Sequence, residues 1–147
     1  MQLCLRDITS RTVTLYIYVL APNEVNDEIL AHHIIAYNQE ASDRVGVREL
    51  ADCRWIVDHS HLSPGGVEQS QQLEQGAHRV RESRLAILTS TDEIYEMASI
   101  FAGFASYRRN MNHSAEVEVF TSFEEAIRWL NLEESIDEIE KFIHTKT

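Results

Sequence analysis

Long hydrophobic stretches are missing from this sequence. No apolar run approaches the ~20 residues that a membrane-spanning helix needs, and residues 1–6 lack the basic region and long apolar stretch of a secretory signal. Only two cysteines are present, Cys4 and Cys53, and their spacing follows no disulfide or metal pattern. Free thiols are typical of a reducing compartment. We therefore expect a cytoplasmic protein with no membrane partner.

Basic residues are also scarce. The chain has 24 acids against 13 bases, a formal net charge of −11. The imbalance is concentrated between Glu116 and Lys141, where nine acids and two bases leave a local charge of −7. Such a surface repels phosphate backbones and anionic lipid heads. We expect no nucleic-acid partner, and we interpret the acidic stretch as a solvated helix face.

Sequence motifs for catalysis are absent as well. The chain has no Gly-x-Ser-x-Gly turn around a nucleophilic serine, and Gly65-Gly66 alone is not a phosphate-binding loop. Cys53 lies in an apolar segment, where burial raises the pKa of a thiol and makes it unreactive. Asp52 beside Arg54 is interpreted as a structural ion pair. These absences predict no catalytic residue and no cofactor, and they favour a protein that is not an enzyme.

One pattern occurs twice in the chain. An apolar run ends in Thr-Ser, and an acidic first helical turn follows it. In both copies the serine and the glutamate three residues later form a capping box, in which each side chain satisfies a backbone N–H at the start of the helix. The pairs are Ser90 with Glu93 and Ser122 with Glu125. The repeated strand-to-helix unit predicts a layered α/β domain.

Apolar periodicity predicts the other elements. Alternating side chains predict a half-buried strand over residues 12–20, paired antiparallel with a short strand that contains Leu3 and Leu5. Asn26 is expected to cap the next helix. The remaining expected elements are that helix to about residue 42, a strand within 48–57, a loop over 58–66, a polar helix over 67–81, helices over 92–109 and 123–130, and an amphipathic C-terminal helix.

Strands that alternate with helices imply a mainly parallel sheet joined by right-handed crossovers. We predict an α/β fold with a single-layer, mixed but mostly parallel sheet of about five strands, helices packed on it and an N-terminal antiparallel hairpin. A chain of 147 residues fits one domain, residues 1–147, in which residues 131–147 form a C-terminal helical extension.

Four stretches carry a likeness to a known family. They are Val-Asn-Asp-Glu-Ile-Leu at 25–30, Arg-Glu-Leu-Ala-Asp-Cys-Arg at 48–54, Leu-Ala-Ile-Leu-Thr-Ser at 85–90, and the Phe-x-x-x-Glu-Glu-Ala-x-x-Trp-Leu pattern within 119–130. With these motifs the order of elements resembles the SpoIIAA-like fold of STAS domains. It is more closely similar to a family of small uncharacterised bacterial proteins with that STAS-like fold, in which the last pattern is a recurrent ending.

The resemblance implies non-covalent regulation or self-association and no reaction. In the anti-sigma-factor antagonists of this fold, a phosphorylated serine lies in an Asp-Ser-x-Gly turn that opens the helix after the central strand. Residues 58–66 stand at that place here and do not contain the motif, although Ser60 and Ser63 are among them. The resemblance leaves open whether either serine is phosphorylated.

The carboxyl ends of the expected strands carry the candidate ligand-binding residues, because ligands of open α/β sheets bind beyond these ends. His59 and His61 form a His-x-His pair, but the further ligands of a metal site are not evident, and we predict no metal. The alternative is an exposed loop, with serines that only cap helices. The candidate residues are Asp58, His59, Ser60, His61, Ser63, Ser90 and Asp92.

The helix expected over 92–109 is apolar on nearly all sides. Besides a core stripe it carries Tyr95, Ile100, Phe104 and Tyr107, which we predict to form an interface. A helix of this kind must be covered on more than one side. The cover is either the chain's own C-terminal helix or a second subunit, since a two-fold dimer is the commonest oligomer. A third alternative is that the aromatic side chains wall an apolar pocket.

These observations favour a cytoplasmic, non-enzymatic regulatory or protein-interaction module that forms a homodimer and can bind a protein partner. An alternative is a carrier for a small apolar or lipid-like ligand, with the aromatic helix as a pocket wall. A further alternative is a metal-dependent hydrolase that uses the loop with His59 and His61.

Overall fold

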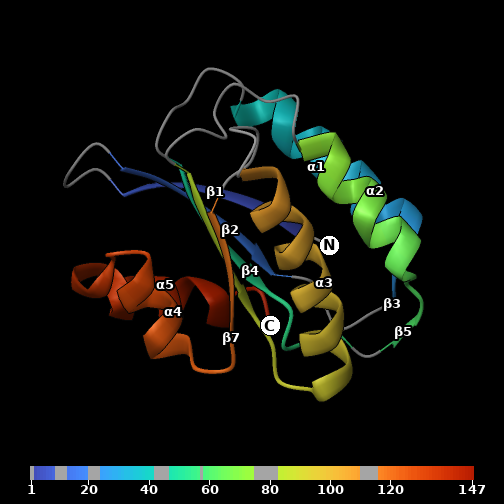
Figure 1. Cartoon of the computed structure of the whole chain (residues 1–147). Helices are drawn as coiled ribbons and strands as arrows, with labels where there is room; N and C mark the ends of the chain where they lie inside the picture. Colours follow the sequence, from blue (N-terminus) through green and yellow to red (C-terminus); the bar gives the residue numbers. More distant parts are fainter. Residues whose placement is uncertain are drawn as a thin grey trace.

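The computed structural model describes residues 2–8, 13–19, 24–41, 47–56, 58–74, 83–109 and 116–147. Its centre is a five-stranded sheet with the order β1-β2-β4-β6-β7 (Figure 1). The sheet strands are β1 (Gln2–Ile8), β2 (Val13–Val19), β4 (Arg48–Asp52), β6 (Arg84–Leu88) and β7 (Glu116–Phe120). The helices are α1 (Asp27–Ala41), α2 (Pro64–Glu74), α3 (Asp92–Arg109), α4 (Phe123–Trp129) and α5 (Ile136–His144), with a short 3₁₀ turn, η2 (Glu133–Ser135), before α5.

The pairing of the strands confirms a mostly parallel α/β sheet. β2, β4, β6 and β7 pair in parallel, and β1 pairs antiparallel with β2 at one edge. A second, two-stranded sheet was not expected: β3 (Glu24–Asn26) pairs in parallel with β5 (Asp58–His61) beside the main sheet.

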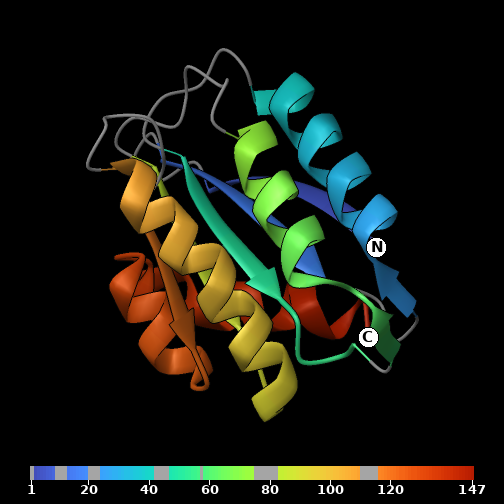
Figure 2. The same cartoon turned by 45° about the vertical axis from the view of Figure 1, so that its right-hand side comes forward.

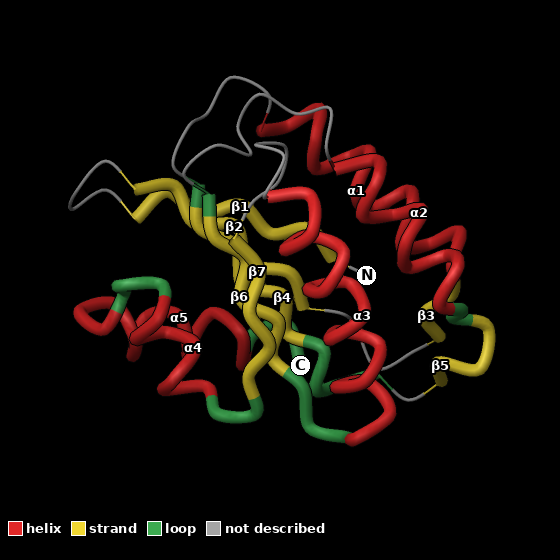
Figure 3. Tube along the Cα trace, viewed as in Figure 1, coloured by secondary structure: helices red, strands yellow, loops and turns green. Residues whose placement is uncertain are grey.

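Helices cover both faces of the main sheet. α1, α2 and α3 lie on one face, and α4 and α5 lie on the other (Figures 1 and 3). This division follows from the strand order, because right-handed crossovers that all advance in one direction place their helices on the same face. α1 and α2 run side by side over that face (Figure 2).

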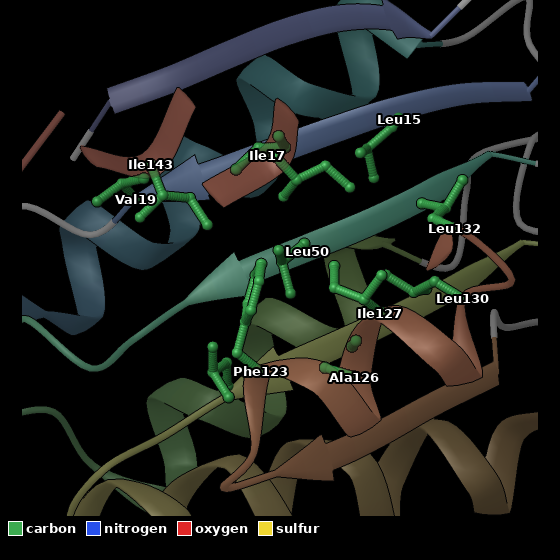
Figure 4. Close-up of a cluster of buried hydrophobic side chains, with 13 residues drawn as sticks. Leu15, Ile17, Val19, Leu50, Phe123, Ala126, Ile127, Leu130, Leu132 and Ile143 are labelled. Atoms are coloured by element: carbon green, nitrogen blue, oxygen red, sulfur yellow. The ribbon is translucent and has the colours of Figure 1, made fainter. Parts of the chain in front are cut away.

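The face under α4 and α5 holds the larger apolar core. Figure 4 shows sheet residues such as Ile17 and Leu50 on the side of Ile127 of α4 and of Leu130, which follows α4. Buried residues of this core are Leu15, Ile17, Val19, Leu50, Ala86, Leu88, Phe123, Ala126, Ile127, Leu130, Leu132, Ile139 and Ile143. The C-terminal helix therefore packs on its own sheet.

β2 is not the half-buried strand that its alternation predicted. Leu15, Ile17 and Val19 face the α4–α5 core as expected, but Tyr18 on the opposite side is only 2% exposed. The helical layer of α1, α2 and α3 covers the second face, and a tyrosine suits that position because its ring is apolar and its hydroxyl can find a hydrogen-bond partner.

Two of the three predicted helix caps are confirmed. The backbone N–H of Ile29 donates to Asn26 Oδ1 (2.8 Å), and that of Glu125 donates to the Ser122 hydroxyl (3.3 Å). The Ser90 cap is wrong by one residue, because α3 begins at Asp92 and the N–H of Ile94 donates to Thr91 Oγ1 (3.4 Å).

The loop predicted over residues 58–66 is also wrong. Residues 58–61 form β5, and α2 begins at Pro64. Proline suits the first helical position because its missing N–H has no helical partner there. The polar helix expected over 67–81 thus starts earlier, and the part of that range beyond Glu74 lies outside the described residues. No helix in the described ranges is both long and apolar enough to cross a bilayer.

The packing of α5 predicts a large loss of stability for Ile139→Ala. Ile139 is fully buried against the sheet, so removing its side chain is expected to lower the free energy of unfolding by about 2–5 kcal/mol. Ile35→Ala, at a 42% exposed position of α1, removes the same atoms and should cost far less. Urea unfolding measures both, and equal losses would show that α5 does not belong to the core.

Candidate functional site

The predicted ligand-binding segment forms an exposed strand. Asp58, Ser60 and His61 are exposed on β5. Asp58 Oδ1 accepts hydrogen bonds from the Ser60 backbone N–H (2.9 Å) and hydroxyl (2.7 Å), and these bonds lower the pKa of the Asp58 carboxyl. No group of three or more metal-competent side chains occurs in the described part of the chain. The described residues therefore do not support a metal site at His59 and His61.

Ser63 lies apart from this strand end, at the start of α2. Its backbone N–H donates to Asp27 Oδ1 (2.8 Å) and its hydroxyl to Asp27 Oδ2 (2.6 Å), while the N–H of Gly66 donates to the Ser63 hydroxyl (3.0 Å). A Cβ on Gly66 would overlap the Asp27 carboxylate, whereas one on Gly65 would meet nothing within 4 Å. The Asp27–Ser63 pair thus joins the first turns of α1 and α2, and it needs glycine at position 66.

Ser90 and Asp92 lie at a different place from Ser63. The Ser90 hydroxyl donates to the backbone carbonyl of Arg54 (3.1 Å), and Asp92 is exposed at the start of α3. The described contacts therefore divide the predicted site in two, one part at β5 and α2 and the other at the ends of β4 and β6.

The ion pair of Asp52 and Arg54 is confirmed. Asp52 is fully buried, and its carboxylate accepts bonds from Arg54 Nε (2.9 Å), Arg54 Nη2 (2.8 Å) and Trp55 Nε1 (3.1 Å). Arg54 and Trp55 line a groove of about 470 Å³ together with Ser122, Glu140 and others. Because Asp52 already neutralises Arg54, the groove offers no excess positive charge to an anion.

An apolar cavity of about 100 Å³ lies between the main sheet and the layer of α1, α2 and α3. Apolar side chains from all of these elements line it, among them Leu30, Val67, Leu85, Ile87 and Phe101. Cys53 also contributes to the lining, and burial raises the pKa of its thiol to about 12. As the sequence predicted, this cysteine is not a nucleophile at neutral pH.

Three polar side chains also line the cavity. Glu49 of β4 is 3% exposed, and its Oε1 accepts a hydrogen bond from the Tyr18 hydroxyl (3.1 Å). The His33 ring of α1 and the Tyr18 ring form a T-shaped pair, with 4.4 Å between their centroids. Burial lowers the pKa of His33 to about 4, so the imidazole is neutral at pH 7. The cavity therefore combines apolar walls with a carboxyl group, a hydroxyl and an uncharged imidazole.

Sequence reasoning missed this cluster. Glu49 was interpreted as part of a family motif, and Tyr18 lies in the strand over residues 12–20 that was predicted to be half-buried. One signal was present: Glu49 lies in a strand expected inside a parallel sheet, and such strands are covered on both faces. Which residues face it depends on tertiary packing, since Tyr18 and Glu49 are 31 residues apart in sequence.

The outer side of α3 carries the exposed part of the predicted interface. Tyr95 is 43% exposed, and Ile100 and Phe104 are partly exposed. The side chain of Tyr107 lies outside the described residues. The inward stripe of Ile94, Met97, Ala98, Phe101 and Ala105 is buried or nearly so, as expected.

Comparison with known proteins identifies no family, because no family model, curated protein or solved structure matches the chain. The resemblance to the SpoIIAA-like family stays a proposal.

The contact at Gly66 predicts opposite effects for two neighbouring substitutions. Gly66→Ala displaces the Asp27 carboxylate from Ser63 and should lower the free energy of unfolding by about 1–3 kcal/mol. Gly65→Ala has open space in the same helical turn and should raise it by about 0.4–1 kcal/mol. Thermal or urea unfolding compares the pair. Equal effects would mean that the Asp27–Ser63 contact does not constrain this turn.

The lowered pKa of His33 predicts a pH dependence of stability. The His33 imidazole takes up a proton near pH 6.5 in the unfolded chain but only near pH 4 in the folded chain. The stability contributed by neutral His33 is therefore present above pH 6.5 and is lost as the pH falls toward 4. Between pH 7 and pH 5 the wild type should lose about 2 kcal/mol more than His33→Gln. His32→Gln, at an exposed neighbouring position, should retain the wild-type dependence in the same urea titrations.

Proposed function

We propose that this chain is a non-enzymatic regulatory or protein-interaction module of STAS-like fold that associates with a second copy of itself through α3. The observation that carries the proposal is an exposed aromatic side chain on α3, Tyr95, which is 43% exposed. Large exposed aromatic side chains are enriched at protein interfaces.

The position of the C-terminal helix supports a second subunit as the cover of α3. Sequence reasoning allowed α5 to cover this helix, but α5 lies on the opposite face of the sheet (Figure 1). Gly103 on α3 is exposed and a Cβ there would meet nothing within 4 Å, so a partner's backbone can approach this side closely.

The remaining features agree with a cytoplasmic interaction module that uses no cofactor. The sequence motifs resemble a family whose members imply self-association and regulation, and a mostly parallel α/β sheet is compatible with that resemblance. The acidic surface opposes binding to nucleic acid or to anionic membranes and leaves a protein surface as the favoured partner.

A second candidate function is that of a carrier for a small apolar ligand. The apolar cavity under α1, α2 and α3 favours it. α3 walls this cavity through its inward residues, such as Ile94 and Phe101, and not through Tyr95 or Phe104.

A native mass spectrum beside the denatured mass tests both functions, and sedimentation equilibrium measures the dimer. A species of twice the chain mass is expected for the module. Tyr95→Glu with Phe104→Glu should raise the dimer dissociation constant at least about 100-fold, because two charges would be buried at the interface. Added mass that is lost on denaturation would instead support the carrier.

Ile35→Glu is the matched control for this experiment. It places the same charge on a 42% exposed apolar position of another helix and should leave the dissociation constant unchanged. A wild type that stays monomeric at high concentration, or a dimer that the α3 double variant does not weaken, contradicts association through this face.

A further inference from the structure

The groove that Arg54 and Trp55 line lies beyond the carboxyl ends of β4 and β7. Arg54 and Trp55 follow β4 in the chain, and Thr121 and Ser122, which also line the groove, follow β7. Ligands of open parallel sheets bind beyond this edge. The groove volume of about 470 Å³ falls within the range of about 300–1,000 Å³ that is usual for ligand sites. The groove therefore has the position and the size of a binding site.

Trp55 forms an exposed wall of this groove and is held in place. It is 38% exposed, although its Nε1 donates to Asp52 Oδ2 (3.1 Å) and the guanidinium carbon of Arg54 lies 5.6 Å from its ring centroid. A side chain that is already fixed loses little conformational entropy when a partner covers it. Tryptophan is also among the residues that contribute most to binding energy at protein interfaces. Trp55 thus offers a preformed contact surface.

The charges around the groove favour a cation. Arg54 is bound through Nε and Nη2 to the buried carboxylate of Asp52, which compensates its charge. Glu124 of α4 and Glu140 of α5 line the groove and are exposed, and Glu124 Oε2 accepts a hydrogen bond from the Ser122 hydroxyl (3.3 Å). With histidine counted as neutral, one cation and three carboxylates leave a charge of −2. The net charge of the whole chain, −11, attracts a basic partner over a longer range.

Arginine suits these surroundings better than lysine. A guanidinium group is planar, so it can stack on an indole ring and pair with a carboxylate through two N–H groups. A lysine ammonium is a compact and strongly hydrated charge that lacks this geometry. Phe123 and Ile143, which are nearly buried, also line the groove and give the methylene stem of an arginine an apolar contact.

We propose that this groove binds an arginine side chain of a protein partner, between Trp55 and the carboxylates of Glu124 and Glu140. The inference names the chemistry of the partner that the interaction module recognises and rests on that proposed function. The groove lies apart from the outer side of α3, so peptide binding and dimer formation are measured separately.

Four ligands titrated into the intact chain at physiological ionic strength separate arginine from charge alone. They are the end-blocked pentapeptides Gly-Arg-Gly-Arg-Gly, Gly-Lys-Gly-Lys-Gly and Gly-Gln-Gly-Gln-Gly, and a single end-blocked arginine. We expect the arginine peptide to bind at least about three-fold more tightly than the lysine peptide and at least about ten-fold more tightly than the glutamine peptide. The single arginine should bind at least about three-fold more weakly than the arginine peptide, because it cannot contact the acidic surface around the groove.

The indole N–H signals of the wild type report where the peptide binds. The chain has two tryptophans, Trp55 and Trp129. Trp129 packs against Phe120, with 5.6 Å between the ring centroids, and does not line the groove. Titration with the arginine peptide should therefore shift the Trp55 signal and leave the Trp129 signal in place.

A double variant tests the two carboxylates. Glu124→Gln with Glu140→Gln should weaken binding of the arginine peptide at least about ten-fold, because both opposite charges in the groove are lost. The matched control is Glu28→Gln with Glu68→Gln, which removes the same charge from α1 and α2 on the other face of the sheet (Figure 1). Because salt screens charges at that distance, the control should change the affinity by less than about two-fold.

A second pair of variants tests the indole ring. Trp55→Leu should weaken binding of the arginine peptide at least about ten-fold, since the stacking surface is lost. Tyr95→Leu, at an exposed aromatic position on α3, should leave the affinity unchanged. Trp55→Leu also removes a hydrogen bond to Asp52, so the glutamate variants test the groove without altering that contact.

Each contrary result overturns a different part of the inference. Equal affinity for the arginine and lysine peptides would show that the groove selects charge and not arginine. Equal affinity for the single arginine would make a small molecule the occupant in place of a protein segment. If no peptide binds, or if neither the glutamate pair nor Trp55→Leu weakens binding, the groove is not a docking site. A chain that binds the peptide but stays monomeric would contradict association through α3 alone.

Discussion

Burial of the parallel sheet on both faces is the constraint on which the structure depends. Parallel strands need long crossovers, and right-handed crossovers that advance in one direction supply helices to one face only. Here α1, α2 and α3 fill that role, which leaves Leu15, Ile17 and Leu50 on the opposite face to be covered. The chain meets this requirement with α4 and α5, so its C-terminal residues complete the core.

The same constraint decides what remains available for function. Because α5 packs on the face opposite α3, Tyr95 of α3 stays exposed, and Ile100 and Phe104 stay partly exposed. Because β4 is central and covered on both sides, a glutamate in that strand must be buried whichever way it points. An interaction surface and a polar group inside an apolar cavity are thus two consequences of one arrangement of layers.

Elements with local signals were predictable from the sequence. The caps at Asn26 and Ser122 depend on residues three positions apart, and the antiparallel hairpin depends on alternation within neighbouring segments. The Ser90 cap was misplaced because Thr91, an equally good capping residue, follows it directly. The segment after residue 57 was misread as a loop because β5 is a strand only through its pairing with β3, a distant partner in sequence.

The candidate site was less predictable than the fold. Its predicted residues make different contacts: Ser63 bonds with Asp27, Ser90 with Arg54, and the Asp58 carboxylate with Ser60. The cluster of Tyr18, His33 and Glu49 was not anticipated, because Tyr18 lies in the strand predicted to be half-buried and a glutamate is normally assigned to solvent.

The sequence by itself determined the class of fold, the elements of the main sheet and most of the helices, because periodicity and capping act over a few residues. Only the tertiary structure decided which faces are covered and which polar groups meet. Those outcomes depend on contacts between residues far apart in the chain, such as Tyr18 with Glu49 and Asp27 with Ser63. Such contacts form only when helices and strands pack, and no local pattern in the sequence encodes them.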